Sequence, residues 1–172
     1  MPELQDVPIK SYSIAAYICR INEGTCQHLI IKRTAGQLGE TWQMISGLLE
    51  AGETAIQAAL REIGEETGLV PERFYSANVL EGFYEIQRNC IALVPVFVGF
   101  VGPDQQVHLS HEHQLYRWVS SDEAADYLVF PHQIETIKSI EANFVSQPPN
   151  PVLEIDLTTV GGTGLTTLKH EL

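Results

Sequence analysis

The segment 47–69, GLLEAGETAIQAALREIGEETGL, constrains the fold of this chain more than any other stretch. A helix turns by about 100° per residue, so Glu62, Glu65 and Glu66 would fall within an arc of about 100° on one face. Apolar residues at helical spacing fall on a neighbouring arc that can face a core; these are Ile56, Ala59, Leu60 and Ile63. The segment therefore predicts an amphipathic helix with carboxylates crowded beside its buried side.

The two ends of this helix are marked in the sequence. Thr54 and Gln57 have the spacing of a capping box, in which each side chain bonds the backbone N–H of the other residue. Gly68 stands where a left-handed glycine is expected to end a helix. We therefore expect a helix over residues 54–67, preceded by a loop in which Gly47 allows a sharp turn or a close approach to a ligand.

The crowded carboxylates create an electrostatic conflict. Like charges at i,i+4 on an exposed helix face cost roughly 0.2–0.5 kcal/mol per pair, and burial would raise their pKa values. A divalent cation removes this conflict, since Mg²⁺ prefers oxygen ligands and typically takes one or two carboxylates together with substrate phosphates. The alternative is a solvated acidic face, because charged helix faces are common.

The spacing of the whole segment is more specific than its acidic face. Every fixed position of the pattern G-x5-E-x7-R-E-U-x-E-E-x-G-U, where U is aliphatic, is matched between Gly47 and Leu69. This pattern is the signature of the Nudix hydrolase family, which the chain resembles over about residues 9–145. The resemblance implies an α/β fold, the Nudix-type α/β/α sandwich with a mixed β-sheet.

The resemblance also implies a metal site. By position, Glu62, Glu65 and Glu66 match the metal-ligating glutamates, and the backbone carbonyl of Ser46 matches a further ligand. Glu65 and Glu66 are also matched to catalytic positions. A later loop in this family usually supplies another carboxylate as base or ligand, and Glu112 is our candidate for both roles.

Four further residues match structural positions of the motif. Glu53 and Arg61 resemble the pair that ties the loop to the helix, and a bidentate, charge-assisted bond suits them. Gly47 and Gly68 are the glycines of the signature.

Several candidates keep a second interpretation. A solvated loop acid is the alternative for Glu112, and lesser candidates for the base are Glu81 and Glu85. Trp42 and Tyr84 could stack on a base and Arg33 could meet phosphates, although core packing and a solvated strand edge explain them equally well. For His111 and His113 we expect a hydrogen-bonding or surface role rather than a zinc site, because no cysteine or third histidine has ligand spacing.

Two stretches resemble one branch of the family, the dihydroneopterin-triphosphate/dATP pyrophosphatases. They are the run E-H-x-x-Y-x-W that begins at Glu112 and the run W-Q-x-x-x-G-x-x-x-x-G-E-T that begins at Trp42. This resemblance rests on fewer positions than the motif itself.

The rest of the chain predicts strands and two more helices around this segment. Pro95 indicates an edge strand or a bulge, and Ser120 with Glu123 forms a second capping box. In the last helix, Glu141 departs from an apolar helical pattern. The expected strands are 11–21, 27–33, 42–45, 74–87 in two pieces around Glu81-Gly82, 89–101 and 115–119; the expected helices are 120–128 and 131–144. We assign 1–145 to one Nudix domain and 146–172 to a C-terminal tail with one candidate strand at 152–157.

The charge balance limits the partners. The chain has 10 Lys and Arg against 22 Asp and Glu, a net charge of −12, which argues against nucleic acid or an anionic membrane as the main partner. A small phosphorylated nucleotide stays open as the substrate, because a bound cation reverses the local sign. Three cysteines without C-x-x-C spacing indicate a reduced, cytoplasmic protein, and no apolar run is long enough to span a membrane.

Together these features predict an enzyme. The expected reaction is Mg²⁺-dependent hydrolysis of a pyrophosphate bond, in a nucleoside triphosphate or a related nucleoside diphosphate derivative, by attack of water at phosphorus; Mn²⁺ could replace Mg²⁺. The alternatives are a dinucleoside polyphosphate or nucleotide-sugar hydrolase and a non-catalytic nucleotide-sensing Nudix domain. The intact glutamates argue against the sensor. A homodimer is also expected from the resemblance.

Overall fold

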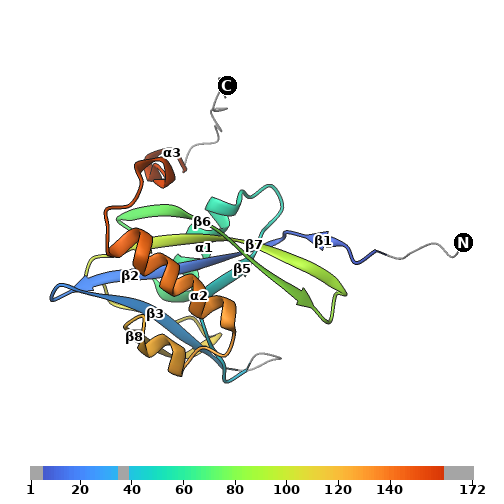
Figure 1. Ribbon diagram of the computed structural model, residues 1–172, viewed down its shortest axis with the longest axis horizontal. Coiled ribbons are helices and arrows are strands. Elements are labelled where there is room, and N and C mark those ends of the chain that lie inside the picture. Colours follow the sequence, from blue (N-terminus) through green and yellow to red (C-terminus); the bar gives the residue numbers. More distant parts are fainter. Residues whose placement is uncertain (1–5, 35–38, 161–172) are drawn as a thin grey trace, which may run out of the picture.

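The computed structural model describes residues 6–34 and 39–160 and shows one eight-stranded sheet (Figure 1). Its strands are β1 (Ile9–Lys10), β2 (Ser13–Asn22), β3 (Thr25–Arg33), β4 (Trp42–Gln43), β5 (Ile45–Leu48), β6 (Arg73–Glu85), β7 (Cys90–Phe100) and β8 (His113–Val119). β7 pairs parallel with β1 and β2 and antiparallel with β6. β2 pairs antiparallel with β3 and β5, and β3 pairs antiparallel with β4 and β8. The predicted mixed sheet is confirmed.

Helices cover both faces of this sheet. Alternate residues of β2 enter two separate buried clusters, one with Ile14, Ala16 and Ile18 and the other with Ala15, Tyr17 and Cys19. The first cluster contains the buried apolar residues of α1 (Ala55–Thr67), and the second contains those of α2 (Pro131–Ile140). In Figure 1, α2 lies in front of the sheet and α1 behind it. A strand buried on both faces must be apolar throughout, which explains the continuous apolar run of β2 and confirms the α/β/α sandwich.

The ends of α1 follow the sequence. Thr54 is the N-cap, and its capping box with Gln57 is complete. Gly68 ends the helix in the left-handed region, at φ 69°, and its N–H donates to the carbonyl of Gly64 over 2.9 Å. These local signals fix the helix that carries the glutamates.

β6 and Pro95 differ from expectation together. β6 is one strand rather than two pieces, and its register against β7 shifts between Ser76 and Leu80. Pro95 pairs with Leu80 at this shift, so a bulge is present but on the partner strand, and the edge alternative is wrong because β7 lies inside the sheet. On the other side of β7, the pairing with β1 ends at Ala92 and the pairing with β2 starts at Val96. The proline, which lacks a backbone donor, thus occupies the gap between two neighbours.

The C-terminal helices differ from the prediction in length or in type. Ser120 and Glu123 make the reciprocal bonds of a capping box, but they open only a 3₁₀ helix, Glu123–Asp126. α2 ends at Ile140, and a π-helical turn, Glu141–Val145, follows it.

The predicted strand at 152–157 is wrong. A 3₁₀ helix, Pro151–Leu153, and the short α3, Leu157–Val160, take its place. Asn150 caps the 3₁₀ helix and Pro151 starts it, a combination that favours a helical turn. A single bridge joins Glu154 to Tyr75 of β6. Residues 161–172 of the proposed tail lie outside the described part of the chain.

Two glycines of α1 give a matched test of its C-cap. Replacing Gly68 by alanine puts a Cβ at positive φ and should lower the free energy of unfolding by about 1–2 kcal/mol. Gly64 lies inside the helix, and a Cβ added there would meet no neighbouring heavy atom within 4 Å. Gly64→Ala should therefore raise the free energy of unfolding by roughly 0.5–1 kcal/mol. Urea denaturation of both variants measures this, and a shift in the same direction for both would contradict the assignment.

Candidate active site

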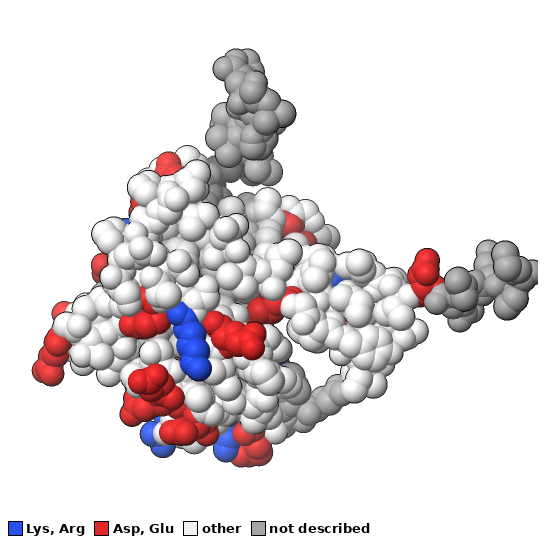
Figure 2. Space-filling model, viewed as in Figure 1, with Lys and Arg blue, Asp and Glu red and all other residues white. Residues whose placement is uncertain are grey.

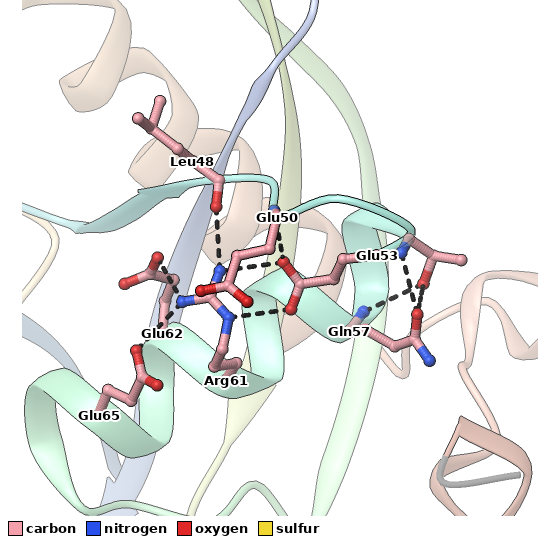
Figure 3. A network of polar contacts seen from close by, with 8 residues as sticks. Leu48, Glu50, Glu53, Gln57, Arg61, Glu62 and Glu65 are labelled. Carbon is pink, nitrogen blue, oxygen red and sulfur yellow. Dashed lines mark hydrogen bonds and ion pairs between the residues drawn. The ribbon is translucent and has the colours of Figure 1, made fainter.

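Arg61 is the centre of a network that joins α1 to the preceding loop (Figure 3). Its Nε and Nη2 donate to the two carboxylate oxygens of Glu53 at 2.9 and 3.0 Å, so the predicted bidentate bond is confirmed. Nη2 also donates to the carbonyl of Leu48 at 2.9 Å. Nη1 donates to Glu62 at 2.8 Å and to Glu65 at 3.1 Å. One guanidinium therefore orients the loop and two of the three glutamates.

Glu53 is held from both sides. The backbone N–H of Glu50 donates to its second oxygen at 2.9 Å. Hydrogen bonds from Arg61, and then this backbone bond, lower the pKa of Glu53, while the bonds to Glu53 raise the pKa of Arg61. Both groups are charged at neutral pH, and their bonding supports a structural role for the pair.

Gly47 is required by the position of Glu62. A Cβ added at Gly47 would lie 2.0 Å from the carboxyl carbon of Glu62, so this side chain lies directly over the glycine. Gly47 and Ser46 belong to β5, which pairs with β2 through Ile14 and Ala15. The sheet thus holds the backbone of Gly47 against Glu62, and the ligand role of the neighbouring Ser46 carbonyl remains a prediction.

Glu66 is the buried member of the group. Only 6% of its surface is exposed, and its Oε2 has no hydrogen-bond partner among the described residues. Burial, and then the charge of Glu62, raises the pKa of Glu66 to about 8; Glu112 and Glu65 add to the effect and Arg33 opposes it. Burial is also the main cause that raises the pKa of Glu62. The carboxylate conflict expected from the sequence is present in the fold.

Two further residues lie beside this group: Glu112, from the loop before β8, and Arg33, the last residue of β3. Arg33 Nη2 lies 2.9 Å from Glu112 Oε2, and the backbone N–H of Thr34 donates to the Glu112 carbonyl at 2.9 Å. The charge of Glu112 raises the pKa of both Glu62 and Glu66. Two residues predicted from distant parts of the sequence thus lie beside the helix.

His113 is a residue that the sequence did not assign to the site, and the expected surface role for it is wrong. Its side chain is fully buried, and Nε2 lies 4.0 Å from Glu66 Oε1. Neither ring nitrogen has a hydrogen-bond partner among the described residues. Burial, and then the charge of Arg33, lowers the pKa of His113, so the ring is neutral. The pairing of His113 with Arg33 across β8 and β3 turns it inward, a register that local spacing does not reveal.

The remaining candidates lie apart from the glutamates. Trp42 packs edge-on against Tyr127 at 5.5 Å and borders the cluster on the α2 side of the sheet. Tyr84 is half exposed near the end of β6, and its hydroxyl donates to Asn89 at 2.7 Å. Roles for Trp42 and Tyr84 in substrate binding remain predictions.

The two lesser candidates for the base also bond elsewhere. Glu81 is buried and accepts hydrogen bonds from Tyr17 and, at 3.0 Å, from Thr136 of α2. Glu85 pairs with Arg88. Of the acids considered for a base outside the helix, Glu112 is the one whose charge acts on Glu62 and Glu66.

The donor set suits a hard divalent cation. The site combines several carboxylate oxygens, an unpartnered buried oxygen of Glu66 and a backbone strand close to Glu62. A cation would reverse the local sign and favour the ionised form of Glu66. Glu62, Glu65, Glu66 and Glu112 therefore offer the type of donor that a metal role requires, and the role itself remains a prediction.

Comparison with known families decides the assignment, since the NUDIX domain family matches residues 11–141. The chain belongs to the Nudix family. Nudix hydrolases generally use a divalent metal, in agreement with the donor set described above. None of the helices in the described ranges is long and apolar enough to cross a membrane.

The relatives of the chain include a tetraphosphatase and an octanoyltransferase. The chain is 28% identical over 136 residues to the asymmetrical bis(5'-nucleosyl)-tetraphosphatase of Rattus norvegicus, a match that covers 76% of this chain and 89% of the rat protein. It is 34% identical over 136 residues to an octanoyltransferase of Myxococcus xanthus, which covers 78% of this chain but only 37% of that protein. The chain thus spans little more than a third of the latter relative.

Solved structures confirm the Nudix fold. An Ap4A hydrolase of Caenorhabditis elegans in a binary complex superposes with a TM-score of 0.66 at 21% identity, covering 79% of this chain and 96% of that one. The dihydroneopterin triphosphate pyrophosphohydrolase of Escherichia coli superposes with a TM-score of 0.61 at 22% identity, covering 77% and 96%. This Nudix protein therefore shares the fold of both structures.

The buried carboxyl of Glu66 predicts a pH-dependent stability of the metal-free protein. Its pKa rises from 4.5 to about 8 on folding, so its contribution to stability is complete below about pH 4.5 and is lost as the pH rises through about 8. Glu66→Gln should therefore gain stability over the native chain progressively between pH 5 and 8. Thermal unfolding in a chelator measures the difference. Glu65→Gln, which removes a mostly exposed carboxylate, is the control, and a pH-independent difference for Glu66→Gln would contradict the prediction.

Proposed function

We propose that this Nudix protein hydrolyses a pyrophosphate bond of a nucleoside polyphosphate, with Mg²⁺ as the cofactor and Mn²⁺ as a substitute. The observation that carries the proposal is Glu66, a buried carboxylate beside other acids whose Oε2 has no hydrogen-bond partner within residues 6–34 and 39–160. A fold that maintains such a group against its own electrostatics indicates a functional site. The intact set of glutamates supports catalysis rather than nucleotide sensing alone.

In this proposal each residue has one task. Glu62, Glu65, Glu66 and the Ser46 carbonyl would hold the metal. When bound, it would neutralise charge on phosphate oxygens and lower the pKa of a water molecule. Glu112 accepts a proton from the attacking water, and Arg33, paired with Glu112, contacts the substrate phosphates. Arg61 keeps its structural role, since its donors already bond the loop and the helix.

Two substrate classes are proposed. The sequence predicts a nucleoside triphosphate or a related diphosphate derivative. The rat tetraphosphatase, matched over 89% of its length, favours a dinucleoside polyphosphate as the second class. The acidic surface, visible as many more Asp and Glu than Lys and Arg side chains on the α2 face (Figure 2), supports a small nucleotide in either case. The free state of Cys19, Cys26 and Cys90 supports a reducing compartment such as the cytoplasm.

Glutamate variants test the catalytic proposal. Glu66→Gln and Glu62→Gln should lower Mg²⁺-dependent kcat by about 100-fold or more, because each loses a metal ligand while the amide keeps the shape of the side chain. Glu135→Gln, which alters an exposed acid of α2, should retain full turnover. Near-ultraviolet circular dichroism verifies the fold of each variant. Undiminished turnover in a folded Glu66→Gln protein would refute the assigned role.

A substrate panel separates the two classes. The native chain is incubated with Mg²⁺ and ATP, dATP, CTP, diadenosine tetraphosphate or ADP-ribose, and the products are resolved by ion-exchange chromatography. A nucleoside monophosphate with pyrophosphate indicates the triphosphate class, and cleavage of the tetraphosphate into two nucleotides indicates the dinucleoside class. No Mg²⁺-dependent cleavage of any of them would count against the proposed function.

A further inference from the structure

A second group of metal-ligating side chains lies on the α2 side of the sheet. Cys19 of β2 and Cys26 and His28 of β3 are buried, and their ligand atoms, one from each residue, lie within 4.8 Å of one another. Glu141, the first residue of the π-helical turn after α2, places Oε2 3.1 Å from Nε2 of His28. Cys19 and Cys26 belong to the buried cluster under α2, whereas α1 and its glutamates cover the opposite face.

The β2–β3 hairpin brings these residues together. Cys19 pairs directly with His28, and Cys26 lies two residues before His28 on the same face of β3. The fourth residue comes from a different part of the chain. Glu141 is the acid that interrupts the apolar helical pattern of 131–144, and its carboxylate reaches back to the hairpin. Turns of π-helix are frequent at functional sites.

The separations suit a tetrahedral ion. Cys19 Sγ lies 3.4 Å from His28 Nδ1, and Cys26 Sγ lies 4.0 Å from His28 Nε2. Zinc bonds of about 2.3 Å to sulfur and 2.0–2.1 Å to nitrogen place tetrahedral S and N ligands about 3.6 Å apart. The two observed distances are close to that value but reach different nitrogens of His28. Because one ligand atom from each of the three residues already lies within 4.8 Å of the others, an ion requires the imidazole to turn until one nitrogen faces both sulfurs.

The ligand types select zinc rather than magnesium. Thiolate and imidazole are preferred by Zn²⁺, whereas Mg²⁺ requires oxygen ligands. The side chain of Glu141 is 31% exposed, which gives an ion a route from solvent to an otherwise enclosed site.

We propose that Cys19, Cys26, His28 and Glu141 bind one Zn²⁺ ion, which fastens the β2–β3 hairpin to the C-terminal end of α2. With four protein ligands the site is closed, as structural zinc sites are. The ion would stabilise the fold, because it binds the assembled ligands and not the unfolded chain. The site is independent of the carboxylate site on the other face.

Cobalt titration of the full chain tests the proposal. Protein freed of metal by a chelator under reducing conditions is titrated with Co²⁺, which should give thiolate-to-cobalt charge transfer and tetrahedral visible bands that saturate at one equivalent. Added Zn²⁺ should abolish these bands and raise the Tm. Glu66→Gln should leave the cobalt spectrum unchanged, which separates this site from the glutamates. A wild-type chain without the charge-transfer band would overturn the proposal.

Cysteine variants locate the ion. Loss of an outer-shell partner costs roughly 10–100-fold in metal affinity, so loss of a thiolate in Cys26→Ser should weaken Co²⁺ binding by at least ~100-fold. Cys90→Ser, which alters a buried cysteine outside the cluster, is the matched control. Charge-transfer bands that persist in Cys26→Ser would overturn the assignment.

A measurement on the native chain covers the case in which Cys26→Ser does not fold. Zn²⁺ should protect Cys19 and Cys26 from alkylation in dilute denaturant, with Cys90 as the internal reference in peptide mass spectra. Equal alkylation of all three cysteines with and without Zn²⁺ would refute the site, as would a Cys19–Cys26 disulfide that forms equally in both conditions.

Discussion

The bonding of one arginine underlies the carboxylate site. The planar guanidinium of Arg61 donates hydrogen bonds to Glu53, the Leu48 carbonyl, Glu62 and Glu65. A lysine would supply the charge but not this geometry, because only the guanidinium presents donors in a fixed plane. The bonds hold the loop after β5 against α1 and partly balance the acids that would otherwise repel each other. The arrangement of the acids therefore depends on a structural group that need not touch the substrate.

One carboxylate of the site, Glu66, is not balanced by a hydrogen bond from Arg61. Arg61 bonds Glu62 and Glu65 but not Glu66 in the described structure, and Glu66 is the most buried of the three. Burying a carboxylate without a hydrogen-bond partner destabilises the folded state. A ligand that binds only the folded state stabilises it again. The fold accepts this cost close to the neutral ring of His113. Stability and function are thus in opposition at one side chain.

Local signals in the sequence were sufficient to predict α1 and the Arg61–Glu53 pair. The capping residue Thr54, the terminal Gly68 and the Arg61–Glu53 pair all act within one short segment, so spacing alone predicts them. Features set by pairing between distant strands could not be predicted in this way. The inward direction of His113 depends on the pairing of β8 with β3. The position of Pro95 depends on where β7 stops pairing with β1 and starts pairing with β2. The cluster of Cys19 and His28 likewise arises from hairpin register and not from a contiguous motif.

The two-sided burial of β2 links both faces of the molecule. Its even-numbered residues from 14 to 18 pack toward α1, and its odd-numbered residues from 15 to 19 pack toward α2. Side chains alternate along a strand, so an insertion or deletion of one residue within β2 would exchange the two sets. Cys19 would then turn toward the glutamate helix, and the strand beside Ser46 would present the wrong side chains. A change of chain length is therefore expected to be tolerated beyond the ends of β2, whereas within the strand only substitutions leave both sets in place.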